Sequence, residues 1–423
     1  SGYPSNSSIG NVYVFVRNGT NWSEQAILTA SDGNTNDLFG SSVVVKENII
    51  IVGAKGYGEP QYNSAEDGAI YVYSRINTAW TEIKKITGIS DENFGISIDL
   101  DINEKNIIIG ANTNSEYESN SGASYIYSYD IGWEEIAKLT ETTPVNNNYF
   151  GQQVAIDSSS NTAIVGENSN GTNHFGYIDA GAIYVFTKST ITEIEHKLTN
   201  PTLSSYAASD FYGWSVAIDG DYAIVGAQMY NNPLNYYHSY GAAFIYHFSN
   251  DRWYVQKTIY GNSSSGRFGY LVRISNNIIG VLGDISTSFY IYTRDGTTWT
   301  EQAKLTYLTY NLAGADINGD TAILTYSASL SKLIVYVKNG TNWDVQETIS
   351  TGSNYGFNAK ISGDNIVVSS ASDIKVYNRS VSTWSLVQTL SDYDGQIIFS
   401  LGSVHYNFVS INNNYFALVS AGY

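Results

Sequence analysis

Short apolar segments recur along the chain about every 40 to 60 residues, each followed by a polar turn and a second apolar segment. The clearest copies read FGSSVVVKENIIIVGA (39–54), FGQQVAIDSSSNTAIVG (150–166) and YGWSVAIDGDYAIVGA (212–227). Turns such as Asp219-Gly220-Asp221 contain residues that tolerate the backbone of short hairpins. Each copy therefore predicts two antiparallel strands, A and B. The third apolar residue of strand A marks eight copies: Val45, Leu100, Ile156, Ile218, Ile274, Ile317, Ile361 and Ile411.

A second hairpin follows each copy. Its first strand, C, alternates aromatic and smaller residues at period two, as in GAIYVYSRINTAWTE (68–82). Its second strand, D, opens with a tryptophan in seven of eight units: Trp22, Trp80, Trp133, Trp253, Trp299, Trp343 and Trp384, with Ile191 in the remaining place. Their recurrence favours packing between neighbouring repeats over ligand stacking.

The two ends of the chain complement each other. The chain opens with a C–D pair (12–28) and closes with an A–B pair (about 404–421). The sequence therefore predicts an all-β propeller of eight four-stranded antiparallel blades, in one domain over residues 1–423, whose ring is closed by the N-terminal C–D and C-terminal A–B strands. An open array or a ring of seven blades is the alternative, because the sixth copy (311–326) lacks the aromatic-glycine pair.

Charge and composition exclude several classes of protein. The chain has 21 basic and 39 acidic residues, a formal net charge of -18, so no nucleic-acid partner is expected. The absence of cysteine excludes disulfides, thiol catalysis and cysteine-ligated metals. No apolar run is long enough to span a bilayer, so no membrane insertion is expected. The first residue, Ser1, fits either a removed secretion signal or a trimmed chain.

The pairing of Phe-Gly with Val-Gly-Ala at this spacing resembles the FG-GAP repeat of integrin α-subunit propellers and of secreted bacterial proteins. LTASDGNTNDLFGSSVVV (28–45) and SVAIDGDYAIVGA (215–227) look most like the bacterial branch. The resemblance covers essentially the whole chain. It implies a secreted or cell-surface protein with a role in adhesion or recognition.

Integrin-type repeats often hold calcium in aspartate-rich A–B turns, but the turns here are too short and too poor in carboxylates for that site. We therefore predict no cofactor and keep calcium as a candidate at two other loops. One loop carries Asp32 and Asp37 with Asn34 and Asn36, and the other carries Glu66 and Asp67. The alternative is that these acids are simply solvated.

The sequence contains few candidate catalytic residues. Five histidines are scattered without metal-ligand spacing, and no phosphate loop or nucleophile elbow occurs. Acids such as Asp91, Asp210 and Asp284 are candidates for glycoside chemistry at a central channel, but nothing selects a pair. We therefore predict a non-enzymatic module that binds a protein or glycan on an extracellular surface. The alternatives are a self-assembling subunit of an extracellular filament or layer, and a carbohydrate-active enzyme.

Loop length indicates where recognition would lie. The B–C loops of the first four A–B copies are long and rich in Tyr, Asn and Gly, whereas those of later copies are shorter. Such loops on a rigid scaffold are typical of recognition surfaces. The alternative is that they pack on one another. The predicted ligand-binding residues are Tyr57, Tyr62, Tyr117, His174, Phe175, Tyr177, Tyr230, Tyr236 and Tyr237.

Glycosylation motifs of the N-x-[ST] type are weak signals in so asparagine-rich a chain. Two of them, at Asn18-Gly19 and Asn339-Gly340, coincide with predicted C–D turns, where Asn-Gly is expected for backbone reasons alone. The candidate asparagines are Asn6, Asn18, Asn21, Asn170, Asn262, Asn339 and Asn378.

Overall fold

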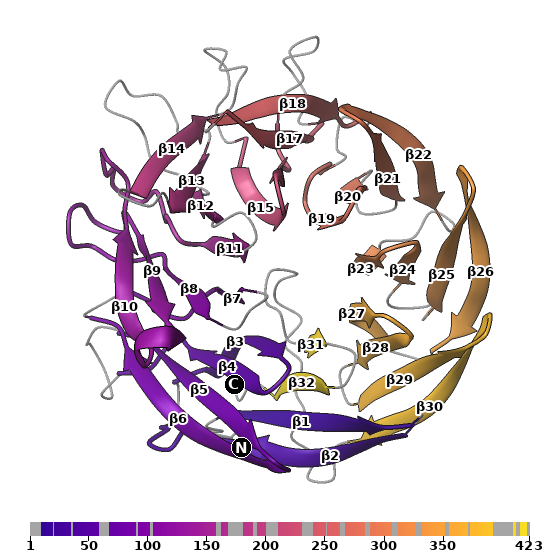
Figure 1. The fold of residues 1–423 in the computed structure, drawn as a ribbon, viewed down its shortest axis with the longest axis horizontal. Helices are drawn as coiled ribbons and strands as arrows, with labels where there is room; N and C mark the ends of the chain where they lie inside the picture. The colour runs from indigo at the N-terminus through magenta and orange to yellow at the C-terminus, as the bar shows by residue number, and fades with distance from the viewer. Residues whose placement is uncertain are drawn as a thin grey trace, which may run out of the picture. The chain divides into compact units, whose positions relative to one another are not determined.

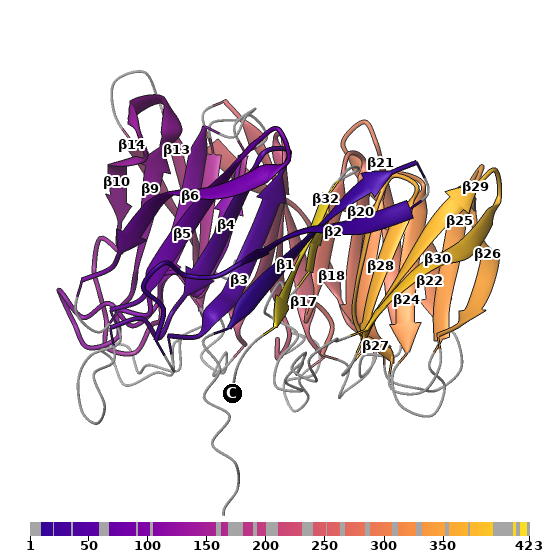
Figure 2. The same ribbon diagram turned by 90° about the horizontal axis from the view of Figure 1, so that it is seen from below.

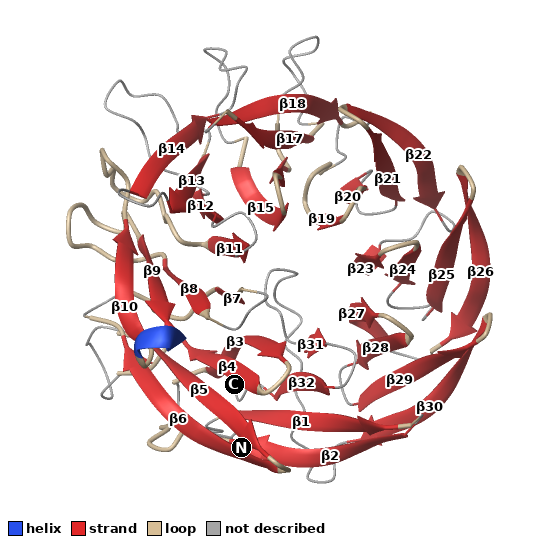
Figure 3. Cartoon of the chain, viewed as in Figure 1, coloured by secondary structure: helices blue, strands red, loops and turns tan. Residues whose placement is uncertain are grey.

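The structure is a computed structural model in which strands account for most of the described chain (Figure 3). The only helical segment among the described residues is the 3-10 turn η1 (Tyr129–Ile131). In the described part of the chain, no helix has the length and apolar composition needed to span a membrane. The structure describes residues 10–19, 21–34, 37–58, 67–89, 92–101, 105–157, 162–167, 181–188, 193–199, 210–230, 240–250, 252–262, 267–283, 288–306, 312–326, 332–351, 355–370, 373–391, 409–411 and 415–420.

The strands form eight antiparallel four-stranded sheets, the blades of an all-β propeller (Figure 1). The predicted fold class and blade number are confirmed. The sixth A–B copy, despite lacking its aromatic-glycine pair, supplies β23 (Leu312–Asn318) and β24 (Thr321–Tyr326) of a complete sheet with β25 (Lys332–Asn339) and β26 (Asn342–Ser350).

The chain separates into two compact units, and the β23–β26 sheet has residues in both. Unit 1 comprises residues 1–98, 323–335 and 346–423. Its complete blades are β31 (Val409–Ile411), β32 (Tyr415–Ser420), β1 (Asn11–Asn18) and β2 (Asn21–Leu28); β3 (Phe39–Lys46), β4 (Ile49–Ala54), β5 (Ala69–Ile76) and β6 (Ala79–Thr87); and β27 (Tyr355–Ser362), β28 (Asn365–Ser370), β29 (Asp373–Ser380) and β30 (Thr383–Ser391).

Unit 2 comprises residues 99–322 and 336–345, so Ile98, the first residue of its first strand, falls in unit 1. Its blades are β7 (Ile98–Leu100), β8 (Asn106–Ala111), β9 (Ala123–Ser128) and β10 (Glu134–Leu139); β11 (Gln153–Asp157), β12 (Thr162–Glu167), β13 (Ala182–Lys188) and β14 (Glu193–Thr199); β15 (Tyr212–Asp219), β16 (Tyr222–Ala227), β17 (Ala242–Ser249) and β18 (Arg252–Tyr260); and β19 (Val272–Ser275), β20 (Ile278–Gly283), β21 (Ser288–Asp295) and β22 (Thr298–Thr306).

One blade of unit 1 is built from both ends of the chain. Strand β1 pairs antiparallel with β32 from Asn11↔Ser420 to Val16↔Tyr415, and both views show the two strands side by side (Figures 1 and 2). The composite blade predicted from the mismatched ends is therefore confirmed. Its strand order is β2-β1-β32-β31, so the terminal strands protect each other's edges.

The two glycine motifs of the repeat meet across blade boundaries. A Cβ atom on Gly53 of strand β4 would lie 2.2 Å from the carbonyl oxygen of Gly95, which opens the next blade. The Ser42 hydroxyl donates to the same oxygen at 2.7 Å. In unit 2 the Ser215 hydroxyl donates to Gly269 O at 2.9 Å in the same way. Close backbone approach explains why glycine stands at both places.

The aromatic ring of the pair packs on strand C of its own blade, and its buried cluster also includes residues of the preceding blade, such as Val14 beside Phe39 and Ile108 beside Phe150. Phe39 meets Tyr71 of its own sheet edge-on, with ring centroids 5.4 Å apart, and Phe150 meets Tyr184 at 4.9 Å. Beside the ring, the backbones of Phe94 and Phe150 form bridges with Gly68 and Gly122 of the preceding blade.

The tryptophans that open strand D are packed in the interior, as predicted. Trp22, Trp133, Trp253, Trp299, Trp343 and Trp384 are buried, and Trp80 is partly buried. In several blades a β-bulge follows, with one extra residue three positions after the tryptophan: Gln25, Ile83, Ile136, Gln256, Gln302 and, in β30, Val387. The bulges interrupt the outermost strand of these blades.

Candidate binding face

The B–C and D–A loops lie at the same end of each blade, because strand A begins where the antiparallel strand B ends. Three B–C loops leave strand B through the same turn. Three residues after the last alanine of the strand, Tyr57, Asn114 and Tyr230 each accept a backbone hydrogen bond from the glycine that precedes strand C, at 2.9 to 3.0 Å. This repeated turn fixes where each loop starts and ends.

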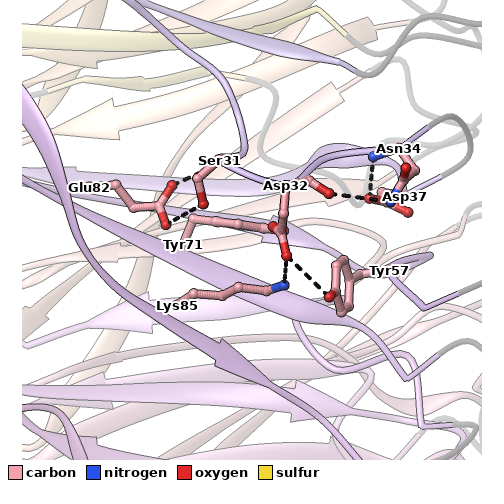
Figure 4. A network of polar contacts seen from close by, with 8 residues as sticks. All are labelled: Ser31, Asp32, Asn34, Asp37, Tyr57, Tyr71, Glu82 and Lys85. Atoms are coloured by element: carbon pink, nitrogen blue, oxygen red, sulfur yellow. Dashed lines mark hydrogen bonds and ion pairs between the residues drawn. The ribbon is translucent and has the colours of Figure 1, made fainter.

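In unit 1 the first B–C loop meets the D–A loop through Asp32. The Asp32 carboxylate accepts hydrogen bonds from the Tyr71 hydroxyl at 2.9 Å and the Tyr57 hydroxyl at 3.2 Å, and it pairs with the Lys85 ammonium (Figure 4). The Lys85 nitrogen also lies 3.4 Å from the centroid of the Tyr57 ring. Tyr57 is therefore held between a carboxylate and a cation and presents no free ring face on the lysine side.

The pairing of Lys85 with Tyr71 is a property of the repeat. The two residues are cross-strand neighbours on β5 and β6, and the ammonium lies 5.4 Å from the ring centroid. Unit 2 has equivalent pairs in Lys138 with Tyr125, at 5.1 Å, and Lys304 with Tyr290, at 5.2 Å. The cation therefore belongs to the scaffold at this end of the blade, and Asp32 is the local addition.

The pKa values of the two aspartates of this D–A loop, Asp32 and Asp37, are shifted in opposite directions. Burial by itself raises the pKa of Asp32, but hydrogen bonds from Lys85 and Tyr71 outweigh it and hold the pKa below its ordinary value. Burial raises the pKa of Asp37 above its ordinary value, against the hydrogen bond that its carboxylate accepts from the Asn34 amide at 2.7 Å. The charge of Asp32 raises the pKa of Asp37 further.

This arrangement bears on the calcium candidates. The Asp32 carboxylate already has a cation and two hydroxyl donors around it, and Asp37 is bound to the loop backbone. Among the described residues no cluster of three or more histidine or acidic side chains is placed to hold a metal ion. In the second candidate loop, Glu66 lies outside the described residues. The backbone carbonyl of Asp67 accepts a hydrogen bond from the backbone N–H of Phe94 at 3.3 Å.

In unit 2 the B–C loop 112–121 is tied to the D–A loop 141–149 by several hydrogen bonds. Ser119 N donates to the Asn146 side chain at 2.9 Å, and Asn147 N donates back to Ser119 O at 2.8 Å. The side chains of Asn120 and Asn147 are also hydrogen-bonded, at 3.0 Å. Glu116 pairs with Lys138 of strand β10. The loop is therefore held from both sides.

Tyr117 lies in this tied loop and is 58% exposed. Tyr230, at the turn of its own loop, is 1% exposed and packs on Phe244 and Tyr260, so in this structure it is part of the core. Tyr57 is partly buried in the Asp32 cluster. The structure thus places one predicted ligand-binding residue on the surface and two in packed positions. The remaining candidates, Tyr62, His174, Phe175, Tyr177, Tyr236 and Tyr237, lie outside the described residues.

A set of aromatic residues that sequence reasoning missed lies at the turn leading into strand A. In five blades this turn has positive φ at the residue before the aromatic-glycine pair: Leu38, Asn93, Tyr149, Phe211 and Arg267. The residue after the glycine donates its backbone N–H to the carbonyl oxygen of this positive-φ residue. In unit 2 that residue is Gln152, Trp214 or Tyr270, and each is partly exposed. The available signal was Trp214, the one tryptophan outside the strand D series.

Of the acids considered for glycoside chemistry, Asp210 is described and buried, and its backbone carbonyl accepts from Met229 N at 3.2 Å. It takes the same place, two residues before the aromatic, as Asp37, Glu92 and Asn148 of other blades. A repeated position points to a role in the turn. Asp91 and Asp284 lie outside the described residues.

The glycosylation candidates have different settings. Asn378 is buried, and its amide donates to Asp364 O at 2.8 Å and to Asn365 at 3.1 Å, so the folded chain has no room for a glycan there. Burial and these two hydrogen bonds disfavour Asn378 as an acceptor, and its glycosylation stays a prediction. Asn18, Asn262 and Asn339 are exposed. The backbone of Asn21 lies in β2, and Asn6 and Asn170 lie outside the described residues.

Three segments of the chain match the family model of the FG-GAP repeat, residues 22–73, 133–186 and 196–246. The first two begin at a strand D tryptophan, and all three end within strand C, so the matched unit spans two adjacent blades. Comparison with curated proteins finds no match.

Among solved structures, apo AztD from Citrobacter koseri superposes with a TM-score of 0.57 at 10% identity, covering 98% of this chain and 99% of that one. A candidate 6-phosphogluconolactonase from Bacteroides uniformis superposes with a TM-score of 0.53 at 10% identity, covering 81% of this chain and 96% of that one. At this identity the likeness extends to the fold alone.

Proposed function

We propose that this protein is a non-enzymatic adhesion or recognition module, a function supported by its β-propeller fold and by the three segments that match the FG-GAP repeat. The module works at an extracellular or cell surface, and its partner is a protein or glycan displayed there. Its binding face is the end of the blades that carries the B–C and D–A loops.

Tyr117 carries this proposal. It is an exposed aromatic residue on a loop whose backbone is already fixed by the neighbouring loop 141–149. A tyrosine held in this way offers apolar area and a hydroxyl while losing little conformational entropy when a partner binds. In unit 1, Asp32, whose side chain is 47% exposed, is a separate polar group at the loop end of its own blade.

The test compares two tyrosines of one blade. Tyr117→Ser should weaken binding to arrayed extracellular proteins and glycans at least tenfold, about 1.4 kcal/mol, with the melting temperature unchanged. Tyr129→Ser is the matched control, since Tyr129 is 52% exposed at the opposite end of strand β9. Equal binding by both variants would overturn the assignment of the face.

The alternative of an assembly subunit has one supporting observation. The strands D are the outer edges of their sheets, and Ile83, Ile136 and Val345 are exposed on them. The bulges at Ile83 and Ile136 oppose edge-to-edge pairing, however, because they interrupt the pairing edge. Native mass spectrometry should find a monomer at all concentrations, and assembly abolished by Ile83→Ser would favour this alternative.

A further inference from the structure

The turns that lead into strand A in unit 2 carry more aromatic surface than the fold requires. Phe211 has a φ of +51° and Tyr149 a φ of +56°, a backbone conformation that disfavours bulky residues. Other blades place Leu38, Asn93 and Arg267 at this position, so no common packing need explains an aromatic there. Backbone strain combined with partial exposure is the pattern found at functional positions.

Trp214 lies next to Phe211 in the same turn. Its backbone N–H donates to Phe211 O at 3.1 Å, and the two rings meet edge-on with centroids 5.5 Å apart. The Trp214 ring also faces Tyr270 of the next blade, with centroids 5.9 Å apart and an interplanar angle of 37°. The three partly exposed rings thus form one continuous group across two blades.

The base of this group is rigid. Tyr212, between Phe211 and Trp214, is fully buried and is hydrogen-bonded to the buried Tyr246. Ser215 ties the turn to Gly269, the residue before Tyr270, through the hydrogen bond at 2.9 Å. A group held in this way is preorganised, so binding would cost little ordering of side chains.

We propose that Phe211, Trp214 and Tyr270 form an aromatic platform that binds a neutral oligosaccharide. Aromatic faces stack on the apolar faces of pyranose rings, and each of the three residues is partly exposed. A hydrogen-bonding group lies beside it in the exposed Arg267, whose backbone carbonyl accepts from Tyr270 N. The net charge of -18 disfavours anionic glycans.

This inference rests on the proposed recognition function and names a ligand class for it. The platform lies at the loop end of its blade, since Met229 of the B–C loop donates to Asp210 of the same turn. The position is distinct from Tyr117, which belongs to a loop two blades earlier in the chain. The two contacts can therefore be tested separately.

The experiment titrates the wild-type protein with cellohexaose, laminarihexaose and mannohexaose by calorimetry and by tryptophan fluorescence. At least one sugar should bind and change the emission, because Trp214 is partly exposed whereas most of the other tryptophans are buried. Trp214→Ala and Tyr270→Ala should each weaken that binding at least tenfold. Tyr254→Ala, at an exposed tyrosine of strand β18 in the same unit, should leave it unchanged.

Failure to bind all three sugars would overturn the platform, as would unchanged binding by folded Trp214→Ala and Tyr270→Ala proteins. If Trp214→Ala does not fold, Tyr270→Ala and Phe211→Ala carry the same test. A wild type that binds an arrayed protein through Tyr117 but no sugar refutes the platform alone. Sugar binding that is lost in Trp214→Ala but unaffected by Tyr117→Ser supports the platform, and the Tyr117 assignment is then judged by binding to the arrayed proteins.

Discussion

The side chain of Gln256 accepts a hydrogen bond from the indole N–H of Trp299 at 2.6 Å, although 43 residues separate them. Gln256 is the extra residue of the bulge in strand β18, and the bulge directs its side chain to the next blade. The same link joins Gln25 to Trp80 and Gln346 to Trp384, each at 2.8 Å. The outermost strands are therefore connected by side chains where their backbones do not pair.

This link predicts coupled effects on stability. Trp299→Ala should lower the free energy of unfolding by about 3 to 5 kcal/mol, because a large buried ring is lost. Gln256→Ala should cost about 1 kcal/mol through the unsatisfied indole N–H. A double-mutant cycle of Gln256→Ala with Trp299→Phe, measured by urea unfolding, should give a coupling energy near 1 kcal/mol. If the two substitutions lower the free energy of unfolding additively, the hydrogen bond makes no measurable contribution to stability.

The contact between glycine backbones predicts a position-specific cost. A Cβ atom on Gly226 would lie 1.9 Å from Gly269 O, so Gly226→Ala must separate the two blades locally. We expect a loss of about 3 kcal/mol in the free energy of unfolding. Gly220→Ala is the control: its φ is +57° but no atom lies within 4 Å, and it should cost about 1 kcal/mol. Equal losses would mean that crowding is unimportant here.

Val381 is expected to be a site of stored strain. It occupies a C–D turn with a φ of +60° and is 97% exposed, so its side chain gains nothing from packing. Asn77 takes the corresponding conformation, also at +60°, in another unit 1 blade. Val381→Asn should therefore stabilise the protein by about 1 kcal/mol. Asn77→Val should destabilise it by a similar amount, and a shift of the same sign for both would refute this account.

The two aspartates of the first D–A loop should affect stability with opposite dependence on pH. The folded pKa of Asp37 is raised, so its charged form costs stability once the pH exceeds the ordinary carboxyl value of 3.8. Asp37→Asn should therefore gain stability over wild type as the pH rises toward 7. Asn148 already occupies the equivalent buried position elsewhere, which makes the substitution conservative.

Asp32 should show the reverse behaviour. Its folded pKa is lowered, so its contribution is present above the unfolded value and is lost as the pH falls through the folded pKa. Asp32→Asn should lose stability relative to wild type near pH 7 and converge with it in acid. The effect is small, because the Asp32 side chain is 47% exposed. Thermal melts of both variants from pH 3 to 7 test the pair; difference curves with the same slope would contradict the assignment.

The sequence alone determined the architecture. The alternation of apolar and polar positions predicted the strands, and their repetition predicted eight sheets. The mismatched ends predicted the pairing of Asn11–Asn18 with Tyr415–Ser420. These inferences succeeded because strand formation and burial follow a period of two residues, which is visible locally, and because each repeat confirms the others.

Only the tertiary structure decided which side chains are available for binding. Tyr117 and Tyr230 come from loops of similar composition, yet one is exposed and the other is buried against Phe244. The pairing of Asp32 with Lys85 and the grouping of Trp214 with Tyr270 join residues 53 and 56 positions apart, respectively. The exposure of a loop side chain depends on what the neighbouring blade and loop place over it, and local periodicity holds no information about those contacts.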